Sequence, residues 1–331
     1  MTRLILRRLA SMVAVLLVLV AMEFFLQQLS PVDPVRVLLG PQASASTQAE
    51  FAHRLGLDRP LPEQYARYLA GVTRGDFGTS VRTRTSVSSD LATAVPATVE
   101  LIGFAILLAA GLGLVLALMS AARWRGAGVL RGVLLAGASA PPFLLALLGI
   151  LVLSNQLGWF PGTGRTSVRD APTGPTGMLV LDSLLDGRVD VAWDAIQHLV
   201  LPATCIALIS AVAVGRVLRG SLIDSLGADY SRTAYSKGLT KRQVLLRHSF
   251  RNSVGPALSM AGLQLGVIFA SDIVVEPIFG WPGMGSYLAQ SIPANDLPAI
   301  SAVTMILGAA YVLTNTAVDI AQALADPRIQ T

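Results

Sequence analysis

Residues 95–119 read VPATVELIGFAILLAAGLGLVLALM, and this stretch decides the fold class. It contains a single charged side chain, Glu100, and it exceeds the roughly 20 apolar residues that a transmembrane helix needs. Proline and glycine do not argue against a helix, because membrane helices tolerate both. Five more stretches have the same character: 9–29, 133–153, 198–215, 256–278 and 299–323. The sequence therefore predicts an all-α, polytopic membrane protein with six transmembrane helices.

The composition agrees with this class and excludes several others. Of the 331 residues, 53% are hydrophobic and 14% are charged, whereas a soluble domain has about 25% charged residues. A disordered chain would combine low hydrophobicity with a high net charge, which is the opposite pattern. One cysteine and three separated histidines exclude a disulfide scaffold, a thiolate metal cluster and a histidine-rich metal site.

The distribution of basic residues predicts the orientation in the membrane. With the N-terminus in the cytoplasm, the cytoplasmic segments hold 15 Lys and Arg residues and 3 acidic residues. The outer loops hold 10 Lys and Arg residues and 12 acidic residues. Cytoplasmic loops carry an excess of Lys and Arg, so both termini are expected to be cytoplasmic. The net charge of +5 is then a membrane-topology signal rather than a nucleic-acid footprint. The cytoplasmic segments are 1–8, 120–132, 216–255 and 324–331.

The first apolar run is expected to remain as a helix. A signal peptide has a shorter apolar core, and the small-residue sequence 43–45 lies well beyond the end of this run. We divide the chain into residues 1–94, with one helix and a large outer loop, and a five-helix core at 95–331. Within that outer loop, 48–55 and 63–69 have helix-like sequence.

No catalytic motif is visible. A phosphate-binding loop needs Gly-Lys followed by Ser or Thr, and the only two lysines, Lys237 and Lys241, do not have this context. The chain is therefore not expected to be an enzyme or to bind ATP.

The basic cytoplasmic loop 216–255 carries a second pattern. Leu222, Leu226, Tyr230 and Ala234 recur every four residues, which predicts one helix face. Gly238 is a plausible helix stop, and Thr240 with Gln243 matches a capping box that begins another helix. One alternative is a loop that only fixes the topology and contacts lipid headgroups, although an exposed apolar face usually has a partner.

Residues 229–239, DYSRTAYSKGL, followed by 244–252, VLLRHSFRN, resemble the cytoplasmic loop of ABC-importer permeases. More narrowly, they resemble the B-type permease of the dipeptide, oligopeptide and nickel import family. Further blocks agree in order, including 75–80 (GDFGTS), 157–161 (LGWFP) and 275–285 (VEPIFGWPGMG). The resemblance implies a type I ABC importer permease-like fold.

The resemblance also implies partners. These are a second homologous permease, two ATPase subunits or one with two ATPase domains, and an extracytoplasmic substrate-binding protein. ATP and Mg would be held by the ATPase subunits, with no cofactor on this chain and no nucleic-acid partner. The inner cell membrane, with its lipids, would be the location.

The family's cytoplasmic loop forms a coupling helix that docks into a groove on an ATPase. Docking of a helix in a groove uses apolar residues one turn apart, which Tyr230 and Ala234 supply. Arg232 and Lys237 would pair with acidic groups on the groove rim, and Gly238 would permit the turn. The expected coupling residues are Asp229, Tyr230, Arg232, Thr233, Ala234, Lys237 and Gly238.

Three acids lie inside the predicted spans near their outer ends. Glu23, Glu100 and Asp272 are five or six residues from those ends, which is roughly 8–9 Å in a helix. An acid is costly in the membrane, and it marks a functional site unless it is paired. One hypothesis is that these acids line the outer part of the translocation path and attract a cationic group. The alternative is that they are wetted at the interface or bonded between helices.

Trp281, Pro282 and Gly283 follow the fifth span on the outer side. They are expected either to form a rigid outer turn that faces the binding protein or to contribute to an aromatic interfacial belt. Two other functions stay open at this point. A stand-alone secondary transporter would have two related halves, which are not visible, and a sensor or scaffold would have a larger soluble domain.

Overall fold

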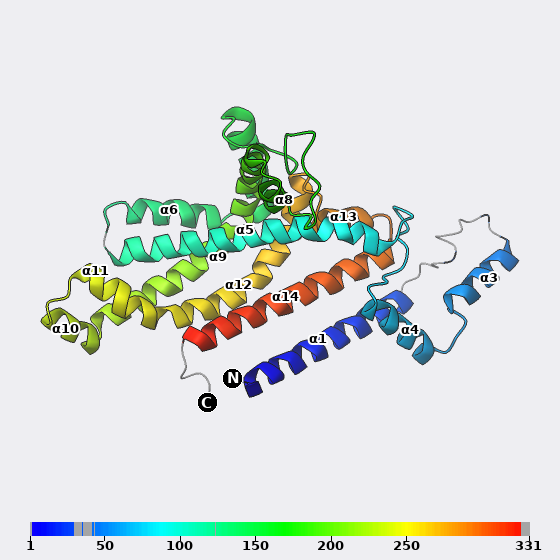
Figure 1. Cartoon of the computed structure of the whole chain (residues 1–331), viewed down its shortest axis with the longest axis horizontal. Coiled ribbons are helices and arrows are strands. Elements are labelled where there is room, and N and C mark those ends of the chain that lie inside the picture. The colour runs from blue at the N-terminus through cyan, green and yellow to red at the C-terminus, as the bar shows by residue number, and fades with distance from the viewer. Residues whose placement is uncertain (1, 30–34, 36–41, 43, 123, 326–331) are drawn as a thin grey trace. The chain divides into compact units, whose positions relative to one another are not determined.

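The computed structural model describes residues 2–29, 35, 42, 44–122 and 124–325 (Figure 1). Predictions for Ala43 and for residues 326–331 of the last cytoplasmic segment lie outside this part. Five helical runs are long and apolar enough to cross a membrane. They lie in α1 (Thr2–Leu29), α5 (Val87–Ala121), α9 (Val189–Gly227), the continuous run Lys241–Ile278 and α14 (Leu297–Ala325).

The third predicted span, 133–153, is not one straight helix. α6 (Ala127–Ala138) is followed by α7 (Pro142–Leu148), which continues into the π-helical segment η1 (Gly149–Gln156). The two parts are bent by 108°, so the count of six spans holds only if the bent pair is one span. Pro141 has extended backbone with ψ 146° because it precedes Pro142, and a residue before proline is disfavoured in the helical region.

The remaining helices are short and connect the long ones. α3 (Ala45–Leu55) and α4 (Leu61–Thr73) confirm the helical sequence predicted in the first outer loop. The others are α8 (Leu179–Leu185), α10 (Asp229–Ser236) and α13 (Met284–Ser291). The long run Lys241–Ile278 consists of α11 (Lys241–Gln243), η2 (Val244–Ser249) and α12 (Phe250–Ile278). Within the described residues the only strand-like pairing is an isolated bridge between Thr79 and Ser86. An all-α fold is thereby confirmed.

The described chain forms two compact units. One unit contains Pro96–Ser286 and the described part of the chain from Tyr311 onward. The other contains Thr2–Val95 and Tyr287–Ala310.

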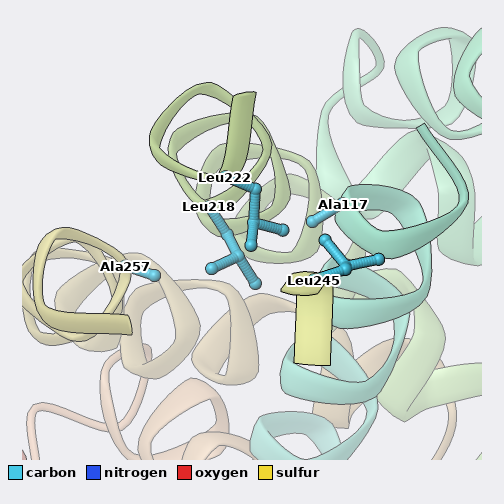
Figure 2. Packing of buried hydrophobic residues seen from close by; sticks show 5 residues of the cluster. All are labelled: Ala117, Leu218, Leu222, Leu245 and Ala257. Carbon is cyan, nitrogen blue, oxygen red and sulfur yellow. The ribbon is translucent and has the colours of Figure 1, made fainter. Parts of the chain in front are cut away.

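The core of the first unit lies where α5, α9, η2 and α12 meet. Ala117, Leu218, Leu222, Leu245 and Ala257 form one buried apolar cluster there (Figure 2). Burying apolar side chains of this size contributes about 1.5–3 kcal/mol each, relative to leaving them exposed in water.

Glycine lets α5 and α9 approach closely. A Cβ atom added to Gly113 would lie 3.0 Å from the backbone oxygen of Ala211, and one added to Gly215 would lie 3.0 Å from the backbone oxygen of Gly113. Small residues allow such approaches at membrane helix interfaces. This contact holds the two helices in register along the unit.

The second unit is held together by aromatic and polar contacts. The Phe24 ring of α1 lies 5.4 Å from that of Tyr65 and 5.8 Å from that of Tyr68, both on α4. Tyr287 donates a 2.9 Å hydrogen bond to Asp90, and Arg82 stacks over its ring at 5.2 Å. Burial raises the pKa of Tyr287 to about 12, so its hydroxyl keeps the proton that it donates.

Candidate functional site

The basic loop 216–255 contains a short helix that is separate from α9. α9 ends at Gly227, and Ala228 has an extended conformation with ψ 156° before α10 begins. The prediction that Leu222, Leu226, Tyr230 and Ala234 share one helix face is therefore wrong. Leu222 is buried in the core cluster and Leu226 packs against it, whereas the other two residues belong to α10.

Small residues anchor α10 to its own chain. Ser231 and Ala234 are buried, and they lie three residues apart on one face. The Ser231 hydroxyl donates to the backbone oxygen of Ser225 at 2.7 Å, and the Tyr230 and Ser225 hydroxyls are 2.6 Å apart. Ala234 thus packs inward and is not an apolar docking residue on the exposed side, while Tyr230 remains 45% exposed.

Charged residues occupy the exposed side of α10. Asp229, Arg232 and Thr233 are exposed, as is Lys237 directly after the helix. The Arg232 guanidinium lies 3.5 Å from the Asp229 carboxylate, and their side chains are 76% and 97% exposed. An ion pair this exposed contributes little to stability, so these charges remain available to a partner.

The turn after α10 has the predicted geometry. Gly238 has φ +83°, a left-handed conformation that glycine adopts without steric cost. Its N–H donates to the Tyr235 carbonyl at 2.9 Å, and Leu239 N–H donates to the Ala234 carbonyl at 3.3 Å. Thr240 and Gln243 form the predicted capping box. The turn therefore presents α10 in one fixed orientation.

At the opposite end of the same unit, Glu276 ties α12 to α5 and to the turn that follows α12. The Thr98 hydroxyl donates to Glu276 Oε1 at 2.6 Å and accepts from the Met284 N–H at 2.7 Å. The Ser286 N–H donates to Glu276 Oε2 at 3.1 Å. All four residues are buried. Glu276 is therefore a hydrogen-bonded interior residue.

The turn 281–283 faces its own chain. Trp281 is only 1% exposed, and its Nε1–H donates to the Ala97 carbonyl at 2.9 Å. Gly283 is buried, because a Cβ atom there would overlap the Glu276 carboxylate. Of the three predicted outer-turn residues only Pro282 is exposed. The indole is therefore neither an interfacial belt residue nor a direct contact for a binding protein.

The predicted membrane acids have different surroundings. Glu100 forms a 2.5 Å ion pair with Arg165 of the second outer loop, and it also accepts from the Val180 N–H at 2.7 Å. Asp272 is fully buried one turn before Glu276, and neither of its oxygens has a hydrogen-bond partner among the described residues. Glu23 is 5% exposed and belongs to the other compact unit. Glu100 is thus already neutralised by an internal cation.

Carboxylates also organise the loop 154–197, which is the second of the predicted outer loops. Thr176 donates to Asp182 through its hydroxyl at 2.7 Å and through its N–H at 3.2 Å. Burial acts to raise the pKa of Asp182, but the hydrogen bonds from Thr176 and from the backbone of Gly177, together with the charge of Arg165, lower that pKa below its ordinary value. Asp194 accepts from the Thr166 hydroxyl at 2.6 Å and from the Ser167 N–H at 2.8 Å. The Asp and Thr residues of this loop are a sequence signal for such bonds.

No grouping of histidine, cysteine and acidic residues that would suit a metal ion occurs in the described part of the chain. The arrangement has an exposed charged helix at one end and a bonded turn at the other. The exposed charged helix offers a surface to a partner.

Comparison with known families gives two matches that together span nearly the whole sequence. A family described as "Binding-protein-dependent transport system inner membrane component" matches residues 109–331. A second, described as "Binding-prot-dependent transport system membrane comp, N-term", matches residues 1–102.

Several curated proteins resemble the chain over almost its full length. The dipeptide transport system permease protein DppB of Alkalihalophilus pseudofirmus is 34% identical over 328 residues, which cover 98% of each chain. The probable D,D-dipeptide transport system permease protein DdpB of Escherichia coli is 38% identical over 310 residues, covering 92% of this chain and 91% of its own. The glutathione transport system permease protein GsiC of Salmonella paratyphi A is 34% identical over 329 residues, covering 98% of each chain.

Proposed function

The chain belongs to the family of inner membrane components of binding-protein-dependent transport systems and is a permease subunit of an ABC importer, and from this premise we propose that it imports peptides or a related small solute. The observation that carries the proposal is the full-length similarity to permeases named for dipeptide, D,D-dipeptide and glutathione transport. Family membership decides against the secondary transporter and the sensor or scaffold that the sequence left open.

The proposed importer contains further subunits. A binding protein on the outer side delivers the solute, a second homologous permease completes the path, and two ATPase subunits bind ATP and Mg. The lack of a phosphate-binding loop in this sequence supports a separate ATPase chain. The distribution of Lys and Arg supports an orientation with both termini in the cytoplasm.

In this orientation α10 is the coupling helix. Its ATPase-facing side comprises Asp229, Arg232, Thr233 and Lys237, because these residues are exposed and charged or polar. Tyr230 adds a half-exposed ring to that side. Movement of the ATPase subunits on ATP binding would then pass through α10 into α9 and α12.

The inward-facing residues of the segment serve this role by holding α10 in place. Ala234 packs against the chain, and Gly238 sets the turn that leads to the next helix. A rigid connection is needed here, because a coupling helix that moves independently of the core transmits no displacement.

The translocation path was expected to involve three acids of the spans, Glu23, Glu100 and Asp272. Glu100 is paired with Arg165, which favours a bond between elements over a role in attracting a cation. Asp272 keeps a carboxylate without a hydrogen-bond partner among the described residues and is the stronger candidate. Glu23 remains a candidate in the other compact unit. Pro282 is the residue of the outer turn that a binding protein would reach.

The first experiment tests coupling. The importer is purified through a tag on this chain, and the recovered ATPase is quantified for Arg232→Glu combined with Lys237→Glu. The recovery is expected to fall by at least tenfold. Arg169→Glu, in the exposed second outer loop, is the matched control and retains the ATPase. Full ATPase recovery with a scrambled 229–238 segment would contradict the assignment of α10.

The second experiment tests the solute. Mass spectrometry of the ligand retained by the cognate binding protein is expected to find peptides, and uptake of the same compound must depend on this permease. A non-peptide ligand whose uptake depends on the permease would overturn the proposed solute class and leave the coupling helix untouched.

A further inference from the structure

A groove of about 800 Å³ lies next to α10 in the first compact unit. Its volume falls within the roughly 300–1,000 Å³ that is typical of small-molecule sites. The end of α5, the turn after it, α10 and the start of the run Lys241–Ile278 all contribute to its walls. The role proposed for α10 does not use this groove.

The floor of the groove is apolar and rests on the core. Leu118, Ala121 and Leu226 line it and also pack against the cluster shown in Figure 2. Leu245 is a member of both. Because the floor is part of a buried cluster, the groove does not depend on a flexible loop for its shape.

The rim carries two cations. Lys241 and Arg242 line the groove and are exposed. Neither forms an ion pair within the described residues, and none of the groove's lining residues is acidic. The capping box of Thr240 and Gln243 fixes the turn of helix that carries both cations. The site therefore combines an apolar floor with positive charge that nothing in its walls neutralises.

An aromatic ring marks the depth of the groove in the membrane. Trp124 lines it, is 59% exposed, and lies just after the apolar run of α5. The indole lies over Gly126, where a Cβ atom would overlap it. Tryptophan is enriched at membrane–water interfaces, so the groove is placed where acyl chains give way to headgroups.

We propose that this groove binds one anionic phospholipid of the cytoplasmic leaflet. An acyl chain lies on Leu118, Leu226 and Leu245, and the phosphate group is held by Lys241 and Arg242. The assignment to that leaflet rests on the proposed orientation, but not on the proposed solute. Basic pockets between membrane helices on the cytoplasmic side are suited to anionic headgroups.

The chemistry of the walls selects this ligand over others. A free anion has no acyl chain that could bind to the apolar floor. A zwitterionic lipid gains less binding energy from the two cations, because its headgroup carries its own positive charge. Tyr235 of α10 lines the same groove as Lys241, so the bound lipid contacts both sides of the turn at Gly238. The lipid would thereby support the orientation of the coupling helix.

The test uses the fluorescence of Trp124 in the intact importer complex. Phosphatidylglycerol with brominated acyl chains is titrated into the detergent-solubilised complex, and the quenching due to Trp124 is obtained by subtracting the same titration of Trp124→Phe. We expect saturable quenching, and a weaker response to brominated phosphatidylcholine. Lys241→Gln combined with Arg242→Gln is expected to raise the phosphatidylglycerol midpoint by roughly 30-fold, since each cation contributes roughly a fivefold preference.

Two further variants separate the groove from general surface charge. Arg247→Gln combined with Arg251→Gln removes the same charge from exposed positions outside the groove, and it should leave the midpoint within about twofold. Ala122→Phe fills the groove at an exposed position without changing charge or adding a tryptophan, and it should abolish saturable quenching.

The following results would overturn the proposal. One is equal quenching by the two brominated lipids. Another is a rise in the phosphatidylglycerol midpoint for Arg247→Gln with Arg251→Gln that equals the rise for Lys241→Gln with Arg242→Gln. The third is the absence of Trp124 quenching in the complex when the permease alone shows it, because an ATPase subunit would then occupy the groove. Inorganic phosphate at the lipid concentration should not displace the lipid. Displacement would mean that the apolar floor contributes nothing.

Discussion

Replacing Thr98 with valine should loosen the outer end of the first compact unit. The Thr98 hydroxyl donates to Glu276 at 2.6 Å and accepts from the Met284 N–H at 2.7 Å, and the residue is 1% exposed. Valine keeps the shape of the side chain but offers neither a donor nor an acceptor. One oxygen of a buried carboxyl and one buried N–H would then lose their partner.

The size of the effect follows from these two groups. A buried polar group left without its partner costs about 1–3 kcal/mol, so the pair predicts a loss of about 3 kcal/mol. For a chain of this length that corresponds to a decrease of roughly 5 °C in the unfolding midpoint, scaling from the value of about 2–4 °C per kcal/mol for smaller domains. Thr98→Ser keeps the hydroxyl and should lose only the contribution of one methyl group, about 1 kcal/mol.

The assay is thermal unfolding of the detergent-solubilised permease, followed by the loss of monodisperse protein on size exclusion after heating. Thr93→Val is the matched control, because Thr93 is exposed on the same helix and donates only to the backbone oxygen of Asp90. A midpoint for Thr98→Val that equals those of Thr98→Ser and Thr93→Val would refute the assignment of Thr98 as the link between Glu276 and the outer turn.

Three further outcomes are expected. Gly238→Ala places a Cβ atom at φ +83°, which should cost about 1–2 kcal/mol locally and lower ATP hydrolysis stimulated by the binding protein; unchanged stimulation would show that the turn tolerates the strain. Arg165→Gln should lower the unfolding midpoint by leaving Glu100 buried without its cation, and adding Glu100→Gln should restore part of the loss, whereas additive losses would deny a coupling between them. The folded pKa of Asp182 lies below its ordinary value of 3.8, so its contribution to the stability of the loop is complete above pH 3.8 and is lost as the pH falls through the folded pKa. Protease cleavage of this loop should therefore rise only below pH 3.8. Cleavage that already rises between pH 7 and 5 would exclude Asp182 as the cause.

Features that depend on a few neighbouring residues were predictable from the sequence. The spans follow from apolar runs, the turn follows from Gly238, and the next helix start follows from Thr240 with Gln243. In each case the determining groups lie within one helical turn or one continuous stretch. A local pattern therefore contains the information that such a feature needs.

Features that depend on distant partners were not predictable in this way. The four-residue repeat across Ala228 suits a continuous helix, yet the chain breaks there. After the break, the Ser231 hydroxyl donates to the Ser225 carbonyl, and Ser231 lies beside Ser249. A proline inside a membrane helix can be tolerated, so the sequence did not predict the bend near Pro141. The extended backbone of Pro141 in the structure shows that the helix is interrupted there.

The acids of the spans show most clearly why the partner matters more than the position. Glu100 and Glu276 both lie near the predicted outer end of a span, and hydropathy alone does not distinguish an acid that faces the solute from one that is bonded to another element. Arg165 is 65 residues from Glu100, and Thr98 is 178 residues from Glu276, so no local pattern connects them. Once these partners are known, both acids act as links between elements of this chain. A path acid must instead be free of such bonds. Asp272 is fully buried but has no hydrogen-bond partner among the described residues, which makes Asp272→Asn more informative for uptake than the same change at Glu100.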